Sequence, residues 1–364
     1  MHYGWLRCKR LTDDKQLFKA LYMIQVVAAF LVTAGHYTAG LGSYTTVTAW
    51  DTALNHLSRF GTVILAMLTG FFTAHSFIGK NTTAASYLVG KFFYIYLPFL
   101  AAGLHYHCVL TTTSFPATLN DWIKIAVGRT GGHLYFIFMI MQYYIFALLF
   151  RHWITRRNIW WFLIAFIGIQ YAFIDYNFYW RGFGVRYFLP TWIFTIYLGH
   201  LFYFYRHSVV AFLQKHRPLR YGLLLISVAG TTFFALSTKL YTANHLRFVL
   251  FTAILTVTLV LLFLSVVKRF SLPFSKGFTY YIYLLHPYII IFLNQWFMRK
   301  WHWNWILDNQ ALSFLYLTWI FVATCILSWI ISKFIGYFDV SKWWLQRNRE
   351  LPLAQRRGRA QSRS

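Results

Sequence analysis

A long uncharged stretch near the start of the chain decides the fold class. Residues 20–50 have the sequence ALYMIQVVAAFLVTAGHYTAGLGSYTTVTAW, which contains no Lys, Arg, Asp or Glu. A helix needs ~20 consecutive, mostly apolar residues to cross the hydrocarbon core of a bilayer. Because the stretch is longer than that, it predicts a membrane-spanning helix.

Nine further charge-free runs follow, each close to or above the same length. They cover residues 60–79, 92–120, 130–150, 158–174, 187–205, 221–238, 248–267, 277–298 and 309–332. The composition agrees, because 59% of the residues are hydrophobic and only 12% are charged, whereas soluble domains carry roughly 25% charge. We therefore predict an all-α, polytopic protein of the cell membrane with ten transmembrane helices.

The net charge of +26 is distributed unevenly over the predicted loops. If the amino terminus lies inside, alternate inner segments hold 25 of the 34 Lys and Arg residues. This is the positive-inside pattern, so both termini are predicted to be cytoplasmic. Residues 1–340 would form one transmembrane domain, and residues 341–364 a basic, disordered tail attracted to anionic membrane lipids. The charge therefore requires no nucleic-acid partner.

Other residue types narrow the functional class. None of the eight acidic residues lies within a predicted span. The carboxylate relay of many proton-coupled pumps is thus missing, which disfavours a proton-coupled solute carrier. Cys8, Cys108 and Cys325 lie far apart along the predicted topology, so they indicate no disulfide framework and no metal site.

Histidines are the ionisable residues that do lie within the predicted spans. Seven of the fourteen are found there: His36, His75, His105, His107, His133, His200 and His286. Ionisable side chains inside a membrane are costly and often functional. His105 and His107 point in different directions because they are two residues apart on a helix, so a shared metal site is not expected. We interpret His75 and His200 as packing residues.

His36 is the strongest candidate among these histidines. It lies roughly 25 Å along the first helix from Lys19, at ~1.5 Å per residue, which places it in the outer half of the membrane. A buried imidazole is mostly neutral there and can accept a proton from a hydroxyl. The alternative is a histidine that only packs and bonds to a neighbouring helix.

Four short segments then occur in an order that resembles a known family. They are VVAAFLVTAGHY at 26–37, KFFYIYLP at 91–98, HLYFI at 133–137 and YIYLLHPY at 281–288. Together they are similar to acyltransferase family 3, integral membrane proteins that O-acylate extracytoplasmic glycans. The narrower resemblance is to the intercellular-adhesin C type, encoded with poly-N-acetylglucosamine synthesis and described both as exporters and as O-acyltransferases.

The resemblance implies roles for individual residues. His36 would be the general base, and His133 would orient the acceptor or pass on a proton, unless it only caps a helix. His286 would lie along the acyl path, unless it only bonds to a carbonyl beside the bend at Pro287. The family usually has basic residues where this chain has Gln25 and Tyr94.

Those basic residues are thought to hold the acyl donor or to tune the histidine. Gln25 supplies hydrogen-bond donors but no charge. The remaining candidates for a cation in this role are Lys91, Arg181, Arg186 and Arg247.

The outer loops offer a possible acceptor site. Residues 175–181 combine Asp175, aromatic residues including Trp180, and an arginine. Aromatic rings can stack on sugar faces while a carboxylate bonds to hydroxyl groups. The alternative is the aromatic belt found at the interfaces of membrane proteins.

We therefore predict a membrane O-acyltransferase with no bound cofactor or metal. It would move an acetyl or succinyl group from acyl-CoA to a hydroxyl of a surface glycan or polysaccharide. His36 and His133 would be catalytic; the residues expected to bind substrate are Gln25, Lys91, Asp175, Trp180, Arg186 and His286. Polysaccharide synthase components are expected partners. The alternative function is polysaccharide export or assembly without acyl transfer.

Overall fold

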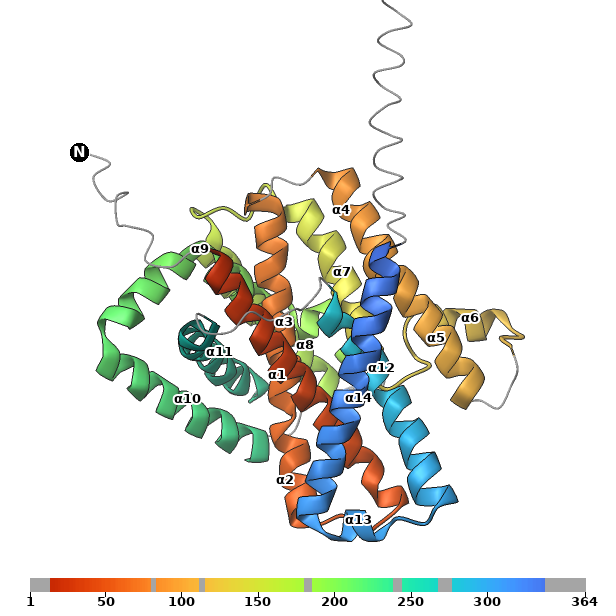
Figure 1. Ribbon diagram of the computed structural model, residues 1–364. Helices are drawn as coiled ribbons and strands as arrows, with labels where there is room; N and C mark the ends of the chain where they lie inside the picture. The colour runs from red at the N-terminus through yellow and green to blue at the C-terminus, as the bar shows by residue number, and fades with distance from the viewer. Residues whose placement is uncertain are drawn as a thin grey trace, which may run out of the picture.

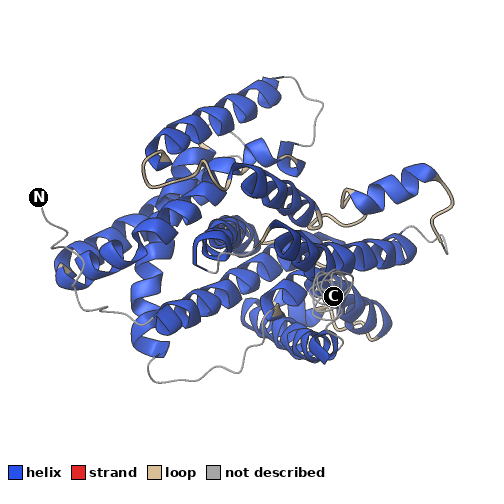
Figure 2. Cartoon of the chain, turned by 90° about the horizontal axis from the view of Figure 1, so that it is seen from above, coloured by secondary structure: helices blue, strands red, loops and turns tan. Residues whose placement is uncertain are grey.

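The computed structural model describes residues 14–79, 83–110, 115–179, 185–237, 244–267 and 277–337, and most of these residues are in helices. Figure 1 shows the helices packed around α1 and α3, and Figure 2 shows that the described chain consists of helices and loops without strands. The predicted all-α fold is thus confirmed. The predicted tail at 341–364 lies outside the described residues.

The α-helices have the following bounds. They are α1 (Asp14–Gly40), α2 (Ala49–Leu57), α3 (Arg59–Ala74), α4 (Ala84–Lys91), α5 (Leu97–Leu110), α6 (Leu119–Ala126), α7 (Tyr135–Phe150), α8 (Ile159–Tyr179), α9 (Ile193–Lys215), α10 (Arg217–Ser237), α11 (His245–Val267), α12 (Phe278–Asn294), α13 (Trp305–Asp308) and α14 (Gln310–Tyr337).

Seven helical segments of the described chain are long and apolar enough to cross a membrane. They are Asp14–Ser43, Ala49–Ile78, Ala84–Val109, Ile159–Asn177, Arg217–Ser237, His245–Val267 and Gln310–Ile335. These segments support a multi-pass membrane protein. Three of the ten predicted spans correspond to α7, α9 and α12, which are not among the seven. The count of ten and the cytoplasmic side of both termini remain predictions.

Helices α3 and α9 cross with their backbones in close contact. A Cβ atom at Gly199 would overlap the Met67 carbonyl, and one at Gly70 would overlap the Ile196 carbonyl. Small residues at a crossing allow this approach, which is how membrane helices gain van der Waals contact. Because α9 is packed in the interior along much of its length, it does not need a fully apolar surface.

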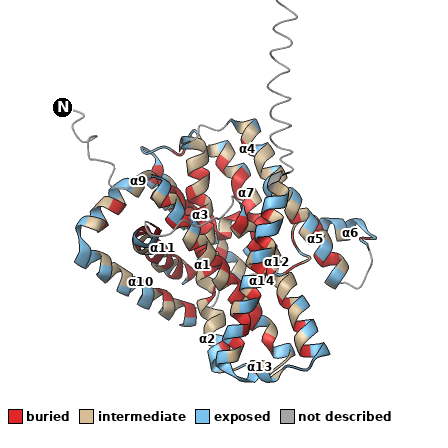
Figure 3. Cartoon of the chain, in the orientation of Figure 1, coloured by how far each residue is buried: buried red, intermediate tan, exposed pale blue. Residues whose placement is uncertain are grey.

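Burial divides the bundle into inner and outer helices (Figure 3). In the most apolar part of the spans that contain α1 and α11, 50% of the residues are buried. In the most apolar part of Ala84–Val109, which contains α5, and of α10, only 17% of the residues are buried. The large apolar side chains on α10, among them Leu225 and Phe233, are exposed. Such a surface is expected where helices face lipid.

The start of α9 differs from the predicted start of its apolar run at residue 187. Pro190 lies in a short 3-10 turn, Leu189–Thr191, and the α-helix begins only at Ile193. A side-chain amide satisfies one of the first backbone N–H groups of α9: Oε1 of Gln170 accepts from the Phe194 N–H at 3.0 Å. The four initial N–H groups of a helix need such partners. Proline therefore delays the helix beyond the charge-free boundary.

Pro98 and Pro287 interrupt two helices that carry predicted motifs. Before Pro98, the segment Phe92–Tyr96 is a π-helical turn, in which the Leu97 N–H donates to the carbonyl of Phe92, five residues earlier. Pro287 lies inside α12. A proline lacks the N–H that a regular helix needs and distorts the preceding turn. The predicted bend at Pro287 thus falls inside a described helix, and a second distorted turn precedes Pro98.

Candidate active site

One side of α1 packs closely against α2, whereas His36 lies on a side of α1 that faces a cavity. A Cβ atom at Gly35 would overlap the Ser58 side chain. The Nδ2 group of Asn55 donates to the Gly35 carbonyl and to Oγ1 of Thr38, both at 3.0 Å. These contacts fix the C-terminal half of α1 against α2. The described residues provide no hydrogen-bond partner for His36, which is half-buried.

Three histidines that are far apart in sequence meet in the fold. The ring centroids of His36 and His286 are 5.0 Å apart, those of His133 and His286 are 5.3 Å apart, and those of His36 and His133 are 5.8 Å apart. His36 comes from α1, His133 from the turn before α7, and His286 from α12. We call these three residues the histidine cluster.

The nitrogen atoms of the histidine cluster are only partly satisfied. His286 is fully buried, and its Nδ1 lies 3.1 Å from the Ile282 carbonyl. A carbonyl accepts only from N–H, so this contact places the proton on Nδ1 and leaves Nε2 as an acceptor. Within the described residues, Nε2 of His286 and Nε2 of His133 are buried without a hydrogen-bond partner. Unpaired buried polar atoms are rare and call for an explanation.

A cavity of about 310 Å³ lies against the histidine cluster. It is lined by His36, Gly40, Ser43, Tyr44, Tyr106, Gly131, Gly132, His133, Pro287, Ile290, Ile291 and Asn294. Ser43 and Gly132 are exposed, so the cavity reaches the protein surface at the end where α1 stops. We call this end the mouth. The charge pattern predicts that it faces the outside of the cell.

Tyr106 of α5 bridges the distorted turn of α12. Its hydroxyl donates to the Leu284 carbonyl at 3.0 Å and accepts from the Tyr288 N–H at 3.0 Å. In a regular helix these two backbone groups would bond to each other. A side chain that inserts into the backbone ladder in this way bends the helix. The ring of Tyr106 also lies 5.0 Å from that of His133.

Tyr283 connects the same turn of α12 to the backbone of His133. Its hydroxyl donates to the His133 carbonyl. Tyr283 lies almost one helical turn before His286, so one short segment of α12 both carries one histidine of the cluster and holds another in place. Two tyrosines thus fix the geometry of the site.

Arg186 is one of the four predicted candidates for a cation at the site, and it lies near the histidine cluster. Its guanidinium lies 4.9 Å from the ring centroid of Tyr135, at the start of α7, and its charge acts on His36 and on the Tyr283 hydroxyl. Arg186 does not line the cavity.

Gln25 and Lys91 lie away from the cavity, toward the other end of the bundle. Oε1 of Gln25 accepts from the Thr279 hydroxyl at 3.3 Å. The ammonium of Lys91 lies 3.9 Å from the ring centroid of Tyr144. Tyr144 is eleven residues after His133, which corresponds to roughly 16 Å along α7. The structure therefore places these residues on the predicted cytoplasmic side of the cluster.

Of the predicted acceptor residues of the outer loop, the one that the structure describes, Asp175, does not join this site. Asp175 is half-buried near the end of α8 and does not line the cavity. Trp180 and Arg181 lie outside the described residues. The aromatic residue that does line the mouth is Tyr44, which the sequence alone did not single out.

An apolar groove of about 590 Å³ runs along α5, α12 and α14. Phe93, Leu97, Leu285 and Ile331 are among its walls. Tyr106 lines both this groove and the cavity, so its ring separates an apolar space from a polar one. The described residues contain no group of three His, Cys, Asp or Glu side chains that is arranged to hold a metal ion.

Comparison with known proteins supports the resemblance. The family model for an acyltransferase domain matches residues 18–333. A probable poly-β-1,6-N-acetyl-D-glucosamine export protein of Staphylococcus epidermidis is 26% identical over 259 residues, which is 65% of this chain and 70% of that protein. One of the same name from Staphylococcus aureus (strain MRSA252) is 25% identical over 261 residues, covering 65% and 71% of the two chains. No solved structure matches.

Proposed function

Because the chain belongs to acyltransferase family 3, we propose that it transfers an acyl group, acetyl or succinyl, to a hydroxyl of a surface polysaccharide. The donor would be a thioester such as acyl-CoA on the cytoplasmic side. The names of the similar staphylococcal proteins suggest poly-β-1,6-N-acetylglucosamine as the acceptor. The site of reaction would be the cavity at the histidine cluster.

The reaction needs a base and a donor of hydrogen bonds. His36 would take the proton of the sugar hydroxyl while its oxygen bonds to the thioester carbon. The carbonyl oxygen becomes an oxyanion, which an N–H of His133 would stabilise. When the intermediate collapses, the carbon–sulfur bond breaks and the thiolate receives the proton from His36. The products are an O-acyl sugar and a free thiol.

The observation that carries this proposal is the unpartnered Nε2 of His133, which lines a surface-connected cavity together with His36 and packs against His286, whose Nε2 is also unpartnered among the described residues. A buried nitrogen without a partner is costly, about 1–3 kcal/mol. Such groups are retained where a substrate can satisfy them. Gln25 and Lys91 lie on the predicted cytoplasmic side of the histidine cluster, which would suit a donor that enters from the side opposite to the mouth.

Export or assembly of the polymer is the second candidate, because the similar staphylococcal proteins carry that name. The size of the cavity favours the enzymatic proposal. A volume of about 310 Å³ is in the range of sites for small ligands, whereas a polymer in transit needs a continuous path. An exporter would also have no need for a base next to its glycan.

The test is the ester-linked acyl content of the surface polymer. Cells with the intact gene should carry O-acyl groups, and the His36→Ala variant should reduce acyl transfer by roughly 10²- to 10⁴-fold. His152→Ala is a matched control, because His152 is exposed at the opposite end of α7 and lies far from the cavity. The amount of each variant in the membrane is measured in parallel.

The two candidates predict different results. Unchanged acyl content in the His36→Ala variant, together with normal insertion, would remove His36 from the mechanism. Loss of surface polymer without any change in acyl content per sugar, when the gene is deleted, would favour export.

A further inference from the structure

The residues that line the mouth of the cavity include polar, uncharged side chains, whereas histidines line its other end. Asn294, which is 2% exposed, lies at the last residue of α12 and lines the cavity. Oδ1 of Asn294 accepts from the Tyr316 hydroxyl of α14 at 3.0 Å. This contact fixes the amide group and leaves its NH₂ without a partner among the described residues.

Tyr44 and Ser43 complete the mouth. Tyr44 is half-buried, and the guanidinium of Arg299 lies 5.7 Å from its ring centroid. Ser43 is exposed, and its hydroxyl bonds to none of the described residues. An aromatic face, an amide donor and a hydroxyl are the groups that bind uncharged sugars, through stacking and directed hydrogen bonds.

We propose that Asn294, Tyr44 and Ser43 form the acceptor subsite and bind one N-acylated sugar unit of the polymer. This inference rests on the proposed acyl transfer. Asn294 would donate a hydrogen bond to an oxygen of the sugar unit, either a hydroxyl or the amide carbonyl. Tyr44 would contact the face of the ring.

The position of Asn294 suits binding rather than chemistry. Asn294 is seven residues beyond Pro287, so it lies roughly 10 Å along α12 from the bend at the histidine cluster. A sugar unit can span part of that distance and present a hydroxyl to His36. Asn294 is therefore a specificity residue, and its loss should affect acceptor binding more than the chemical step.

The charges at the mouth favour an N-acylated sugar over a free amino sugar. The described residues that line the cavity include no acid, and Arg299 brings a positive charge next to Tyr44. A protonated amine in the cavity would meet no carboxylate in the lining and would be repelled by the guanidinium; Asp308, which accepts from the Thr45 hydroxyl at 2.6 Å, does not line the cavity. An acetamido group has a carbonyl oxygen that the amide NH₂ of Asn294 can bind.

The experiment uses the full-length protein in proteoliposomes with acetyl-CoA and succinyl-CoA as donors. The acceptors are a β-1,6-linked N-acetylglucosamine oligosaccharide and its N-deacetylated form. The main variant is the double substitution Asn294→Leu and Tyr316→Phe, because removing both partners of a buried hydrogen bond leaves neither unsatisfied. Tyr316→Phe alone is the matched control, since it keeps the amide of Asn294.

The double variant should raise KM for the N-acetylated acceptor by roughly 3- to 10-fold, the value of about one hydrogen bond. KM for the donor and kcat should stay within about twofold of the wild type. The wild type should prefer the N-acetylated acceptor, and the double variant should lose most of that preference. The Tyr316→Phe control should show less than half of the effect on acceptor KM.

Other results would overturn the inference in distinguishable ways. If the wild type acylates and the double variant keeps its acceptor KM, the acceptor subsite is wrong and the proposed function stands. If donor KM, acceptor KM and kcat all change together, Asn294 only supports the fold and the subsite is wrong. If the wild type transfers no acyl group to either acceptor, the proposed function and the subsite both fail.

Discussion

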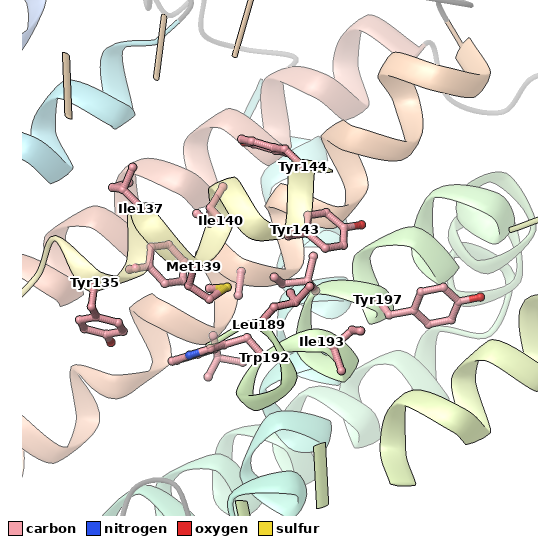
Figure 4. Close-up of a cluster of buried hydrophobic side chains, with 14 of the residues drawn as sticks. Tyr135, Ile137, Met139, Ile140, Tyr143, Tyr144, Leu189, Trp192, Ile193 and Tyr197 are labelled. Carbon is pink, nitrogen blue, oxygen red and sulfur yellow. The ribbon is translucent and has the colours of Figure 1, made fainter. Parts of the chain in front are cut away.

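The histidine cluster and the environment of His200 are two buried imidazole sites with different hydrogen bonding. His200 of α9 is 4% exposed, and its Nδ1 lies 2.6 Å from the hydroxyl of Tyr143 on α7. The Tyr197 ring is parallel to its imidazole, at 6.0 Å between centroids. Figure 4 shows Tyr143 and Tyr197 within the packed contact between α7 and α9. The cluster instead leaves two Nε2 atoms unpartnered beside a cavity.

This difference shows that burial alone does not identify a functional histidine in a membrane. Both sites lie within charge-free runs, and both exclude water on most sides. His200 uses a nitrogen to join two helices, whereas the cluster leaves its nitrogens available at the price of an unsatisfied polar group. The predictions below test whether hydrogen bonding separates function from packing.

After His36→Ala, the largest loss of acyl transfer is expected when His133 is replaced. The His133→Leu variant should lower acyl transfer by roughly 10²- to 10³-fold, the usual loss when one oxyanion donor is removed. Its Tm in detergent should fall by no more than the loss of the His133 contact with the Leu284 backbone would cause, because Nε2 of His133 has no partner and Tyr283 bonds only to the backbone carbonyl. Initial rates at a saturating donor concentration measure acyl transfer, and thermal unfolding of the purified protein measures Tm. Loss of activity in parallel with loss of Tm would assign His133 to packing.

Filling the cavity with a larger side chain should cause the next largest loss of acyl transfer. A side chain at Gly40 meets no atom within 4 Å of its Cβ, and Gly40 lines the cavity. Gly40→Leu should therefore reduce acyl transfer by roughly 10- to 100-fold, as when a pocket excludes part of its ligand, and should preserve the fold. Gly222→Leu on α10 is the matched control, since its Cβ also meets open space. Equal activity of the two variants would show that the acceptor does not enter this cavity.

The sequence predicted the members of the histidine cluster separately but not their meeting. His36, His133 and His286 each lie in a charge-free run with a motif, and this is a local signal that a single sequence can carry. Their approach to within 6 Å depends on how α1, α7 and α12 pack, which no spacing along the chain encodes. The same limit applies to Arg186, which the sequence offered as one of four equivalent cations.

Sequence analysis did not identify Tyr106 and Asn294 as residues of the site, for a different reason in each case. Tyrosine is common throughout this chain, with 26 examples, so Tyr106 carried no distinguishing signal. Asn294 did carry one, because it is a polar residue inside the uncharged run 277–298, where a polar side chain needs a partner. The acceptor prediction instead followed the dense group of aromatic and charged residues around Asp175, and the described acid of that group, Asp175, does not line the cavity.

Removing the Tyr106 hydroxyl should have a smaller effect than filling the cavity. In the Tyr106→Phe variant the Leu284 carbonyl and the Tyr288 N–H lose their bridge, which lets the turn carrying His286 change its shape. We expect kcat to fall roughly 5- to 10-fold, the value of about one hydrogen bond, while KM for the acceptor stays near that of the wild type.

Tyr288→Phe is the control for the loss of a hydroxyl nearby. It removes a hydroxyl from the wall of the apolar groove and leaves the backbone N–H of residue 288 bonded to Tyr106. Its kcat should match that of the wild type. If the two variants behave alike, the bridge does not position the histidine cluster.

The smallest effect on acyl transfer is expected at His200, even though its hydrogen bond is short. His200→Leu leaves the Tyr143 hydroxyl buried without a partner, which should lower the free energy of unfolding by about 1–2 kcal/mol. The double variant His200→Leu with Tyr143→Phe should recover most of that loss, because neither side chain then has an unsatisfied polar atom. Activity per folded molecule should equal that of the wild type in both variants, as judged by initial rates and by thermal unfolding in the same detergent. A fall in kcat with full stability in the double variant would mean that a histidine hydrogen-bonded to a neighbouring helix also serves the reaction, and the distinction between the two sites would no longer hold.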